Sequence, residues 1–216
     1  MEQYKGNTPL EPGRDSDFQR LVRQRKQVPV NTAVILLNIL VFLLVEITGT
    51  SLNAQHMVDC GASYTPYIYQ GHQYYRLVTS MFLHFGIQHL GNNILVLFFV
   101  GDCLERTVGK IKYLLIYLLG GIGANVISLA LEISHQEAVV SAGASGAVFA
   151  VIGALIYIVI RNRGYIENFT ARQLLILAAL SLYHGVTSAG VDNAAHFGGL
   201  LCGFVLCVLL YHRRRL

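Results

Sequence analysis

Residues 141–153, SAGASGAVFAVIG, place Ser145 between small residues at the start of an apolar segment. Three histidines, His84, His89 and His196, stand at the edges of other apolar segments. A serine hydroxyl becomes a nucleophile when a neighbouring imidazole accepts its proton. These residue types support nucleophilic catalysis if the fold brings them together, so the elements that carry them come next.

The composition indicates a membrane protein. Of the 216 residues, 54% are hydrophobic and only 13% are charged, and the mean hydropathy is +0.50. A soluble domain carries roughly 25% charged residues. This deficit leaves no room for a large soluble domain, and the four cysteines lack the spacing of a zinc site or a disulfide framework.

Six apolar segments are candidates to cross a hydrocarbon core of about 30 Å as helices. They lie at about 31–49, 87–105, 113–133, 145–160, 171–188 and 195–212. Of the 16 Lys and Arg residues, all but Arg76 lie on one side of the membrane in this arrangement. The positive-inside rule therefore predicts that both termini are cytoplasmic. The fourth segment is short, and we expect its helix to begin at Ser145, below the surface, after a loop at 134–144.

Four polar residues share one layer of these predicted spans. Ser145, His89 and His196 each precede an arginine at the cytoplasmic boundary by 16 or 17 residues. That is about 24–26 Å of helix, which places them near the outer face of the hydrocarbon core. Asn93 is four residues after His89, on the same helix face. Singly, such residues are typical of interfaces and helix packing, but their common depth favours a functional site.

Glycines predict that two of these spans touch. The GASG sequence at 143–146 surrounds Ser145 with small residues, so a peptide carbonyl can approach the N-terminus of a helix that stabilises an oxyanion. In the sixth span, Gly199 and Gly203 are four residues apart and form a smooth face. If the fourth span packs against that face, His196 reaches Ser145.

Five motifs, in order along the chain, resemble those of the rhomboid family of intramembrane serine proteases. They are YYRLVTSMFLH with Arg76, HFGIQHLGNN with His84, His89 and Asn93, GDCLERTVG with Glu105, GASGA with Ser145, and AHFGGLLCG with His196. One departure is Tyr75, which stands where the family has a tryptophan. The resemblance covers roughly residues 50–212 and implies an all-α polytopic membrane protein, a rhomboid-like bundle of six transmembrane helices.

The resemblance also implies an enzyme, a hydrolase that performs intramembrane proteolysis with a Ser–His dyad. Ser145 would be the nucleophile and His196 the general base, and the oxyanion would be bound by His89, Asn93 and the backbone N–H of Ser145. Phe149, one turn after Ser145, would stack on the base. The other supporting residues are Gly143, Gly146, Gly199, Gly203, His84, Arg76 and Glu105.

Three of these supporting residues are expected to be structural. Arg76 would lock the expected external segment, residues 50–86, by hydrogen bonds, and His84 would hold that segment against the start of the second span. Glu105 would bind a neighbouring helix by hydrogen bonds, with a solvated end charge as the alternative.

The resemblance implies partners as well. These are transmembrane protein substrates and the lipid bilayer, with no cofactor, metal ion or nucleic acid. Residues 1–28 are expected to form a cytoplasmic tail, which either binds anionic lipid or serves as a plain topology signal, and residues 29–216 the protease domain. The polar N-terminus lacks a targeting pattern, which favours a multi-pass protein of a bacterial plasma membrane.

The main alternative is a catalytically silent rhomboid-like protein that binds unstable membrane helices for quality control. Such a protein would lack Ser145 or His196, and both are present. A transporter would show matching broken helices in its two halves. A zinc protease would need a His-Glu-x-x-His string, which the sequence does not contain.

Overall fold

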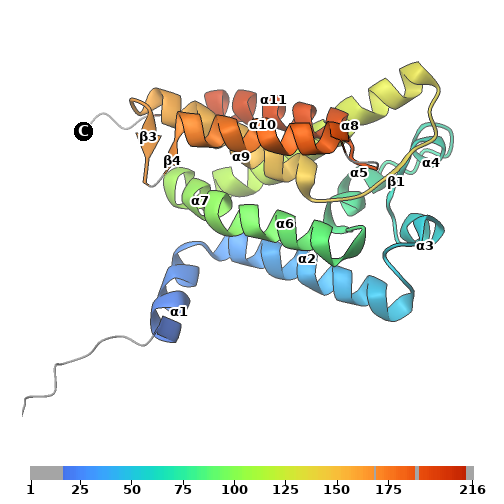
Figure 1. Cartoon of the computed structure of the whole chain (residues 1–216), viewed down its shortest axis with the longest axis horizontal. Helices are drawn as coiled ribbons and strands as arrows, with labels where there is room; N and C mark the ends of the chain where they lie inside the picture. The colour runs from blue at the N-terminus through green and yellow to red at the C-terminus, as the bar shows by residue number, and fades with distance from the viewer. Residues whose placement is uncertain (1–16, 168, 188–189, 213–216) are drawn as a thin grey trace, which may run out of the picture.

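Helices follow the apolar segments of the chain closely in the computed structural model, which describes residues 17–167, 169–187 and 190–212 (Figure 1). The tail residues 1–16 and the arginines at 213–215 lie outside the described residues. The elements in chain order are α1 Asp17–Gln27, α2 Pro29–Thr48, α3 Ala54–Asp59, β1 Ser63–Tyr64, α4 Thr65–Tyr69, α5 Arg76–Thr79, the 3₁₀ turn η1 Ser80–Phe82, α6 Gly86–Val96, the π-helical turn η2 Leu97–Gly101, α7 Asp102–Val108, α8 Lys110–His135, β2 Val140–Ser141, α9 Ser145–Arg161, β3 Tyr165–Ile166, β4 Phe169–Thr170, α10 Ala171–Thr187 and α11 Asn193–Leu210.

Four stretches among the described residues are long and apolar enough to cross a membrane. They are α2, the continuous stretch Gly86–Val108, α8 and α11. The helices α9 and α10 add 17 residues each, which is about 26 Å of helix. The chain is therefore an all-α polytopic membrane protein, as its hydropathy predicts.

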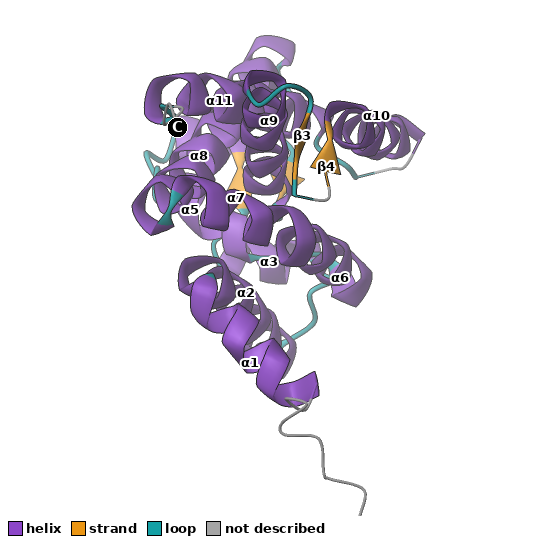
Figure 2. Cartoon of the chain, turned by 90° about the vertical axis from the view of Figure 1, so that its left-hand side faces the viewer, coloured by secondary structure: helices purple, strands orange, loops and turns teal. Residues whose placement is uncertain are grey.

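The short helix α9 lies inside the bundle, with α7, α8, α10 and α11 around it (Figure 2). Its side chains are apolar on nearly every face, and most of them are buried. Glycines bring α11 against it, because a Cβ at Gly203 would collide with the Ala150 carbonyl oxygen and one at Gly199 with that of Gly146. The predicted close packing on the Gly199 and Gly203 face is confirmed, and the structure identifies the partner, which the sequence left open, as the fourth span.

The second span, expected at about 87–105, is one continuous helical stretch, Gly86–Val108, whose α-helical hydrogen-bond pattern is broken once. The π-helical turn η2 interrupts it, and the carbonyl oxygen of Leu97 accepts a hydrogen bond from Asn31 Nδ2 of α2 at 2.7 Å. Such turns occur where a side chain inserts into the helical ladder. A Cβ at Gly101 would lie 2.8 Å from Asn31 Oδ1, so the glycine makes room for this side chain.

Asn31 is the centre of a buried group that we name the Asn31 cluster. Its Nδ2 also donates to Asp102 Oδ1 at 2.6 Å, and its Oδ1 accepts from the Tyr113 hydroxyl at 2.5 Å. Asp102 in turn pairs with Arg25 of α1. The cluster consists of Arg25, Asn31, Asp102, Glu105 and Tyr113, and it joins α1, α2, α7 and α8 at the end of the bundle where α1 lies (Figure 1).

The segment 134–144 differs from the expected loop. Its first two residues complete α8, and Val140–Ser141 forms strand β2, which pairs antiparallel with β1 in the register Ser63↔Ser141. Backbone groups that dip toward a membrane need partners, and the β1 strand of the external segment supplies them. This pairing leaves only residues 142–144 between β2 and Ser145.

Candidate active site

Ser145 is the first residue of α9, as the short fourth span predicts. Among the described residues, no side chain caps this helix start. The first N–H groups of an α-helix have no partner within the helix, and the helix dipole makes this end attractive to negative charge. The half-buried Ser145 therefore lies beside backbone donors that remain available to an oxyanion.

The residues just before Ser145 are held by two hydrogen bonds. The Gly143 N–H donates to the Ser80 carbonyl oxygen at 2.9 Å, and the Ala144 N–H donates to His84 Nε2 at 3.3 Å. His84 is 1% exposed, so it serves as a buried acceptor. The structure thus corrects its expected role, because His84 binds the segment that precedes Ser145 and not only the start of the second span.

His89 and Ser145 approach the same point beside Gly143. A Cβ built on Gly143 would lie 2.9 Å from His89 Nε2 and 3.4 Å from Ser145 Oγ. Gly143 has φ +153°, a backbone conformation that residues with side chains rarely adopt. Glycine here therefore meets two requirements, a backbone angle and a space between the imidazole and the hydroxyl.

His196 lies in the first turns of α11, with its ring stacked on that of Phe149. The ring centroids are 4.4 Å apart and the planes are 16° from parallel. His196 is 8% exposed, and its Nδ1 has no hydrogen-bond partner among the described residues. Because Phe149 is one turn after Ser145, the stacking brings the imidazole to the same side of α9 as the serine.

Asn93 is one turn after His89 on α6, and we include it for that reason in what we name the Ser145 cluster. It is 6% exposed, and its Nδ2 donates to the His89 carbonyl oxygen at 3.0 Å, one turn back on α6. The cluster consists of His89, Asn93, Ser145, Phe149 and His196. Among the described residues no hydrogen bond joins Ser145 to His196.

Comparisons with known proteins match the sequence of this chain to one family. The family model of the Rhomboid domain matches residues 71–213. The chain belongs to the rhomboid family. It is 38% identical over 176 residues to Rhomboid protease GluP of Bacillus subtilis, 32% over 214 residues to Rhomboid protease AarA of Providencia stuartii, and 41% over 144 residues to RHOMBOID-like protein 2 of Arabidopsis thaliana.

The lengths covered differ between these relatives. The alignments cover 82%, 87% and 66% of this rhomboid, and 34%, 75% and 44% of the respective relatives. The chain thus spans about a third of GluP and less than half of the Arabidopsis protein. Their names describe those proteins, and the activity of this rhomboid is argued below from its own residues.

Two other predicted residues of this rhomboid are fully engaged in structure. Arg76 is 5% exposed, and its guanidinium donates to the carbonyl oxygens of Val58 at 2.7 Å and Ala62 at 2.9 Å, which holds the external segment together. Glu105 is 2% exposed and accepts the N–H of Asn31 at 2.6 Å, at the start of α2. The solvated end charge considered for Glu105 is therefore wrong.

Sequence reasoning missed Asp192, which caps the helix that carries His196. The structure starts α11 at Asn193, and the Asp192 carboxylate accepts the Ala195 N–H at 2.8 Å. An aspartate just before an apolar helical run is a typical N-cap. The signal was present in the sequence, but placing the sixth span at about 195 left Asp192 outside it.

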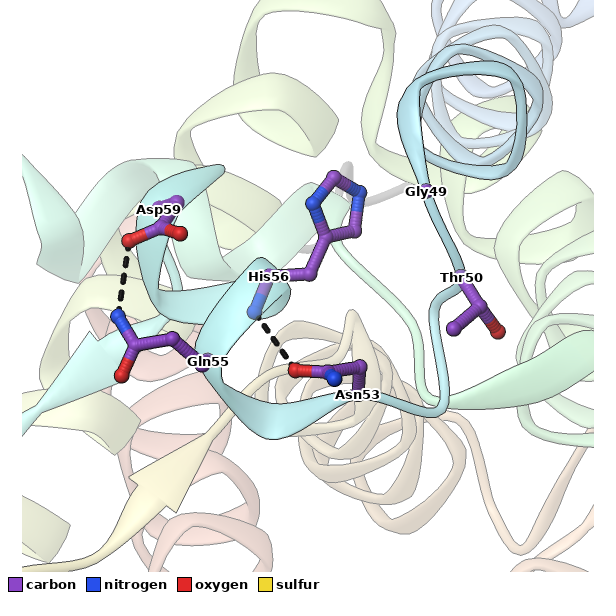
Figure 3. Close-up of a pocket in the computed structure, with 6 residues that line it drawn as sticks. All are labelled: Gly49, Thr50, Asn53, Gln55, His56 and Asp59. Carbon is purple, nitrogen blue, oxygen red and sulfur yellow. Dashed lines mark hydrogen bonds between the residues drawn. The ribbon is translucent and has the colours of Figure 1, made fainter.

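A surface pocket of this rhomboid, of about 370 Å³, lies away from the Ser145 cluster, between the end of α2 and α3 (Figure 3). Its polar groups bond one another, since Gln55 donates to Asp59 at 2.9 Å and the His56 N–H donates to Asn53 at 3.0 Å. The nearby Cys60 is no activated nucleophile, because burial and the neighbouring Asp59 carboxylate raise the pKa of its thiol.

Proposed function

We propose that this rhomboid is an intramembrane serine endopeptidase that hydrolyses peptide bonds in or near transmembrane segments of membrane proteins. The observation that carries the proposal is the stacking of His196 on Phe149, one turn from Ser145 at the uncapped start of α9. A serine at a helix N-terminus beside a buried imidazole is an arrangement suited to acyl transfer.

In the proposed mechanism, Ser145 Oγ attacks the carbonyl carbon of the scissile bond and gives its proton to His196. The carbonyl oxygen becomes an oxyanion, which the Ser145 N–H and the side chains of His89 and Asn93 stabilise. When the C–N bond breaks, the imidazolium returns the proton to the leaving amine. Water then attacks the acyl-enzyme and gives a proton to His196, the ester bond to Ser145 Oγ breaks, and the imidazolium returns the proton to Ser145.

The proposal extends to where cleavage occurs. Both termini are cytoplasmic in this reading, so the Ser145 cluster lies near the outer face of a bacterial plasma membrane. The narrow glycine-lined surroundings of Ser145 favour small substrate residues near the outer end of a substrate helix. Mass spectrometry of the products locates the cut bond, and a cut near the cytoplasmic end contradicts this placement.

The experiment that tests the activity is labelling of the purified protein in detergent with a fluorophosphonate, which reacts with activated serines. We expect the wild type to be labelled, and Ser145→Ala and His196→Ala to be unlabelled. Ser141→Ala is the matched control, because Ser141 lies in β2 close along the chain and should leave labelling unchanged. A folded wild type without label contradicts the proposal and favours the catalytically silent quality-control binder.

A further inference from the structure

Asp192 holds the first turn of the helix that carries His196. Its Oδ1 accepts the Ala195 N–H at 2.8 Å, and its backbone carbonyl oxygen accepts the His196 N–H at 3.1 Å. His196 is therefore one helical turn from this carboxylate, and the Asp192 backbone binds the His196 backbone directly. Any displacement of Asp192 moves the imidazole as well.

The second carboxylate oxygen of Asp192 is bound from another helix. The Ser128 hydroxyl of α8 donates to Asp192 Oδ2 at 2.7 Å, and Ser128 is 4% exposed. The same hydroxyl oxygen lies 3.3 Å from Glu132 Oε1, and the Thr65 hydroxyl at the start of α4 donates to the other oxygen of Glu132. A chain of contacts therefore ties the external segment, α8 and α11 together at this point.

The Ser128 hydroxyl has one proton to donate, and it lies between two carboxylates. A serine hydroxyl donates only one hydrogen bond, so Ser128 cannot satisfy both carboxylates, and the shorter contact selects Asp192. Both oxygens of Asp192 then accept a hydrogen bond, one from a backbone N–H and one from a hydroxyl. That is the arrangement that stabilises an ionised carboxylate.

The His196 ring has no such carboxylate in contact. Its Nδ1 is buried without a hydrogen-bond partner among the described residues. In the proposed mechanism this ring becomes a cation, and a buried cation needs a nearby negative charge. The charged or titratable side chains that act on it are Asp192, at the start of its own helix, and His89 of α6, while Glu132 of α8 acts on Asp192.

We infer that Asp192 is a positioning residue of the reaction, which fixes the first turn of α11 and stabilises the charged His196 through space. It performs across one helical turn what the aspartate of a catalytic triad performs by direct contact. This inference rests on the proposed function, in which His196 is the general base.

The test uses Asp192→Asn in the full-length protein, because asparagine remains a good N-cap but carries no charge. We measure kcat and KM for a transmembrane substrate across pH in detergent, together with the thermal midpoint. The base must be neutral to act, and removing the negative charge makes its protonation harder. The acidic limb of the profile of kcat/KM against pH should therefore move to lower pH by about half to one unit. We also expect kcat to fall about threefold to tenfold and KM to stay unchanged.

Two further variants separate charge from folding. Asp192→Ala removes the cap as well, so we expect the same shift of the acidic limb together with a lower thermal midpoint. Asp59→Asn, on the exposed external helix α3, should leave both the limb and the midpoint unchanged. An acidic limb that stays in place in Asp192→Asn, with an unaltered thermal midpoint, overturns the inference.

A readout without turnover keeps this inference separate from the proposed function. NMR of histidine-labelled protein follows the titration of the His196 ring. The signal of this ring is assigned by its absence from the spectrum of His196→Gln. The titration should move to lower pH in Asp192→Asn, and an unmoved titration contradicts the role of Asp192. A wild type without Ser145-dependent turnover contradicts the proposed function instead, and the titration still decides the role of Asp192.

Discussion

The Asn31 cluster and the Ser145 cluster are two groups of buried and half-buried residues, mostly polar, at different places in one bundle. They differ in how many of their hydrogen bonds are made within the protein. Every polar atom of the Asn31 side chain, at the centre of its cluster, has a partner, from Leu97, Asp102 and Tyr113, and only Arg25 Nε at the edge of that cluster has none among the described residues. In the Ser145 cluster, His196 Nδ1 has none among the described residues, and the start of α9 is uncapped.

The difference separates stability from chemistry. A buried polar group whose bonds are all made within the protein contributes to the fold, whereas one left unpaired costs about 1–3 kcal/mol. Unpaired groups remain available to a substrate and to developing charge. We therefore expect changes in the Ser145 cluster to affect turnover and changes in the Asn31 cluster to affect the free energy of unfolding.

The largest effect is expected for His196→Gln, which removes the proposed base. Turnover of a transmembrane substrate should fall about 10⁴-fold or more, because dyad residues act as a unit. The thermal midpoint should hold within a few degrees, since the ring makes no side-chain hydrogen bond to a described residue. His135→Gln, at the exposed end of α8, is the control and should retain full turnover.

Asn93→Ala tests the proposed oxyanion site on the same helix as His89. Loss of one such donor lowers kcat by about 10²–10³-fold. Asn92→Ala is a closely matched control, because Asn92 is the neighbouring residue and is exposed. Equal activities of the two variants in a kinetic assay would remove Asn93 from the site.

Asn31→Ala should show the opposite behaviour. It leaves the Tyr113 hydroxyl without its partner and removes one hydrogen bond each from Asp102 and the Leu97 carbonyl oxygen, so the free energy of unfolding in micelles should fall by about 2–4 kcal/mol. Asp102 still pairs with Arg25, and the Leu97 carbonyl oxygen still accepts the Asp102 N–H. The folded fraction should keep wild-type kcat. Thr32→Ala, whose hydroxyl bonds only its own helix, is the control, and a selective loss of kcat in Asn31→Ala would break the contrast.

The smallest effect is expected for Glu167→Gln, at the ion pair that joins Arg106 of α7 to the turn between β3 and β4. The pair is partly exposed and screened by solvent, so it contributes about 1 kcal/mol or less. The Arg106 hydrogen bond lowers the pKa of Glu167. The stabilisation is therefore present above the ordinary glutamate value of about 4.3 and is lost as pH falls through the lowered pKa.

Unfolding of the wild type and Glu167→Gln at several pH values checks this prediction. The difference in stability should be constant near neutral pH and should vanish in acid. A difference that grows as the pH falls would show that another group carries the effect.

Hydropathy predicted the long apolar helices, and the start of α9 at Ser145 followed from the shortness of its apolar segment. Hydropathy did not predict the polar helix α1 or the short helices α3, α4 and α5. The π-helical turn at Leu97–Gly101 could not be predicted this way, because the residue that occupies it, Asn31, is on another helix. The position of His84 against Ala144 was missed for the same reason, since 60 residues separate the two partners.

The sequence by itself determined which segments are apolar, where polar residues interrupt them, and which residue types are able to act as nucleophile and base. These follow from local composition and spacing, because each segment that crosses a membrane must itself be long and apolar enough. Only the tertiary structure decided that Gly199 and Gly203 seat α11 against the backbone of α9, that His196 lies flat on Phe149, and that Ser128 binds Asp192. Each of these contacts joins residues far apart in the chain, and close packing of whole helices selects such partners where local periodicity does not.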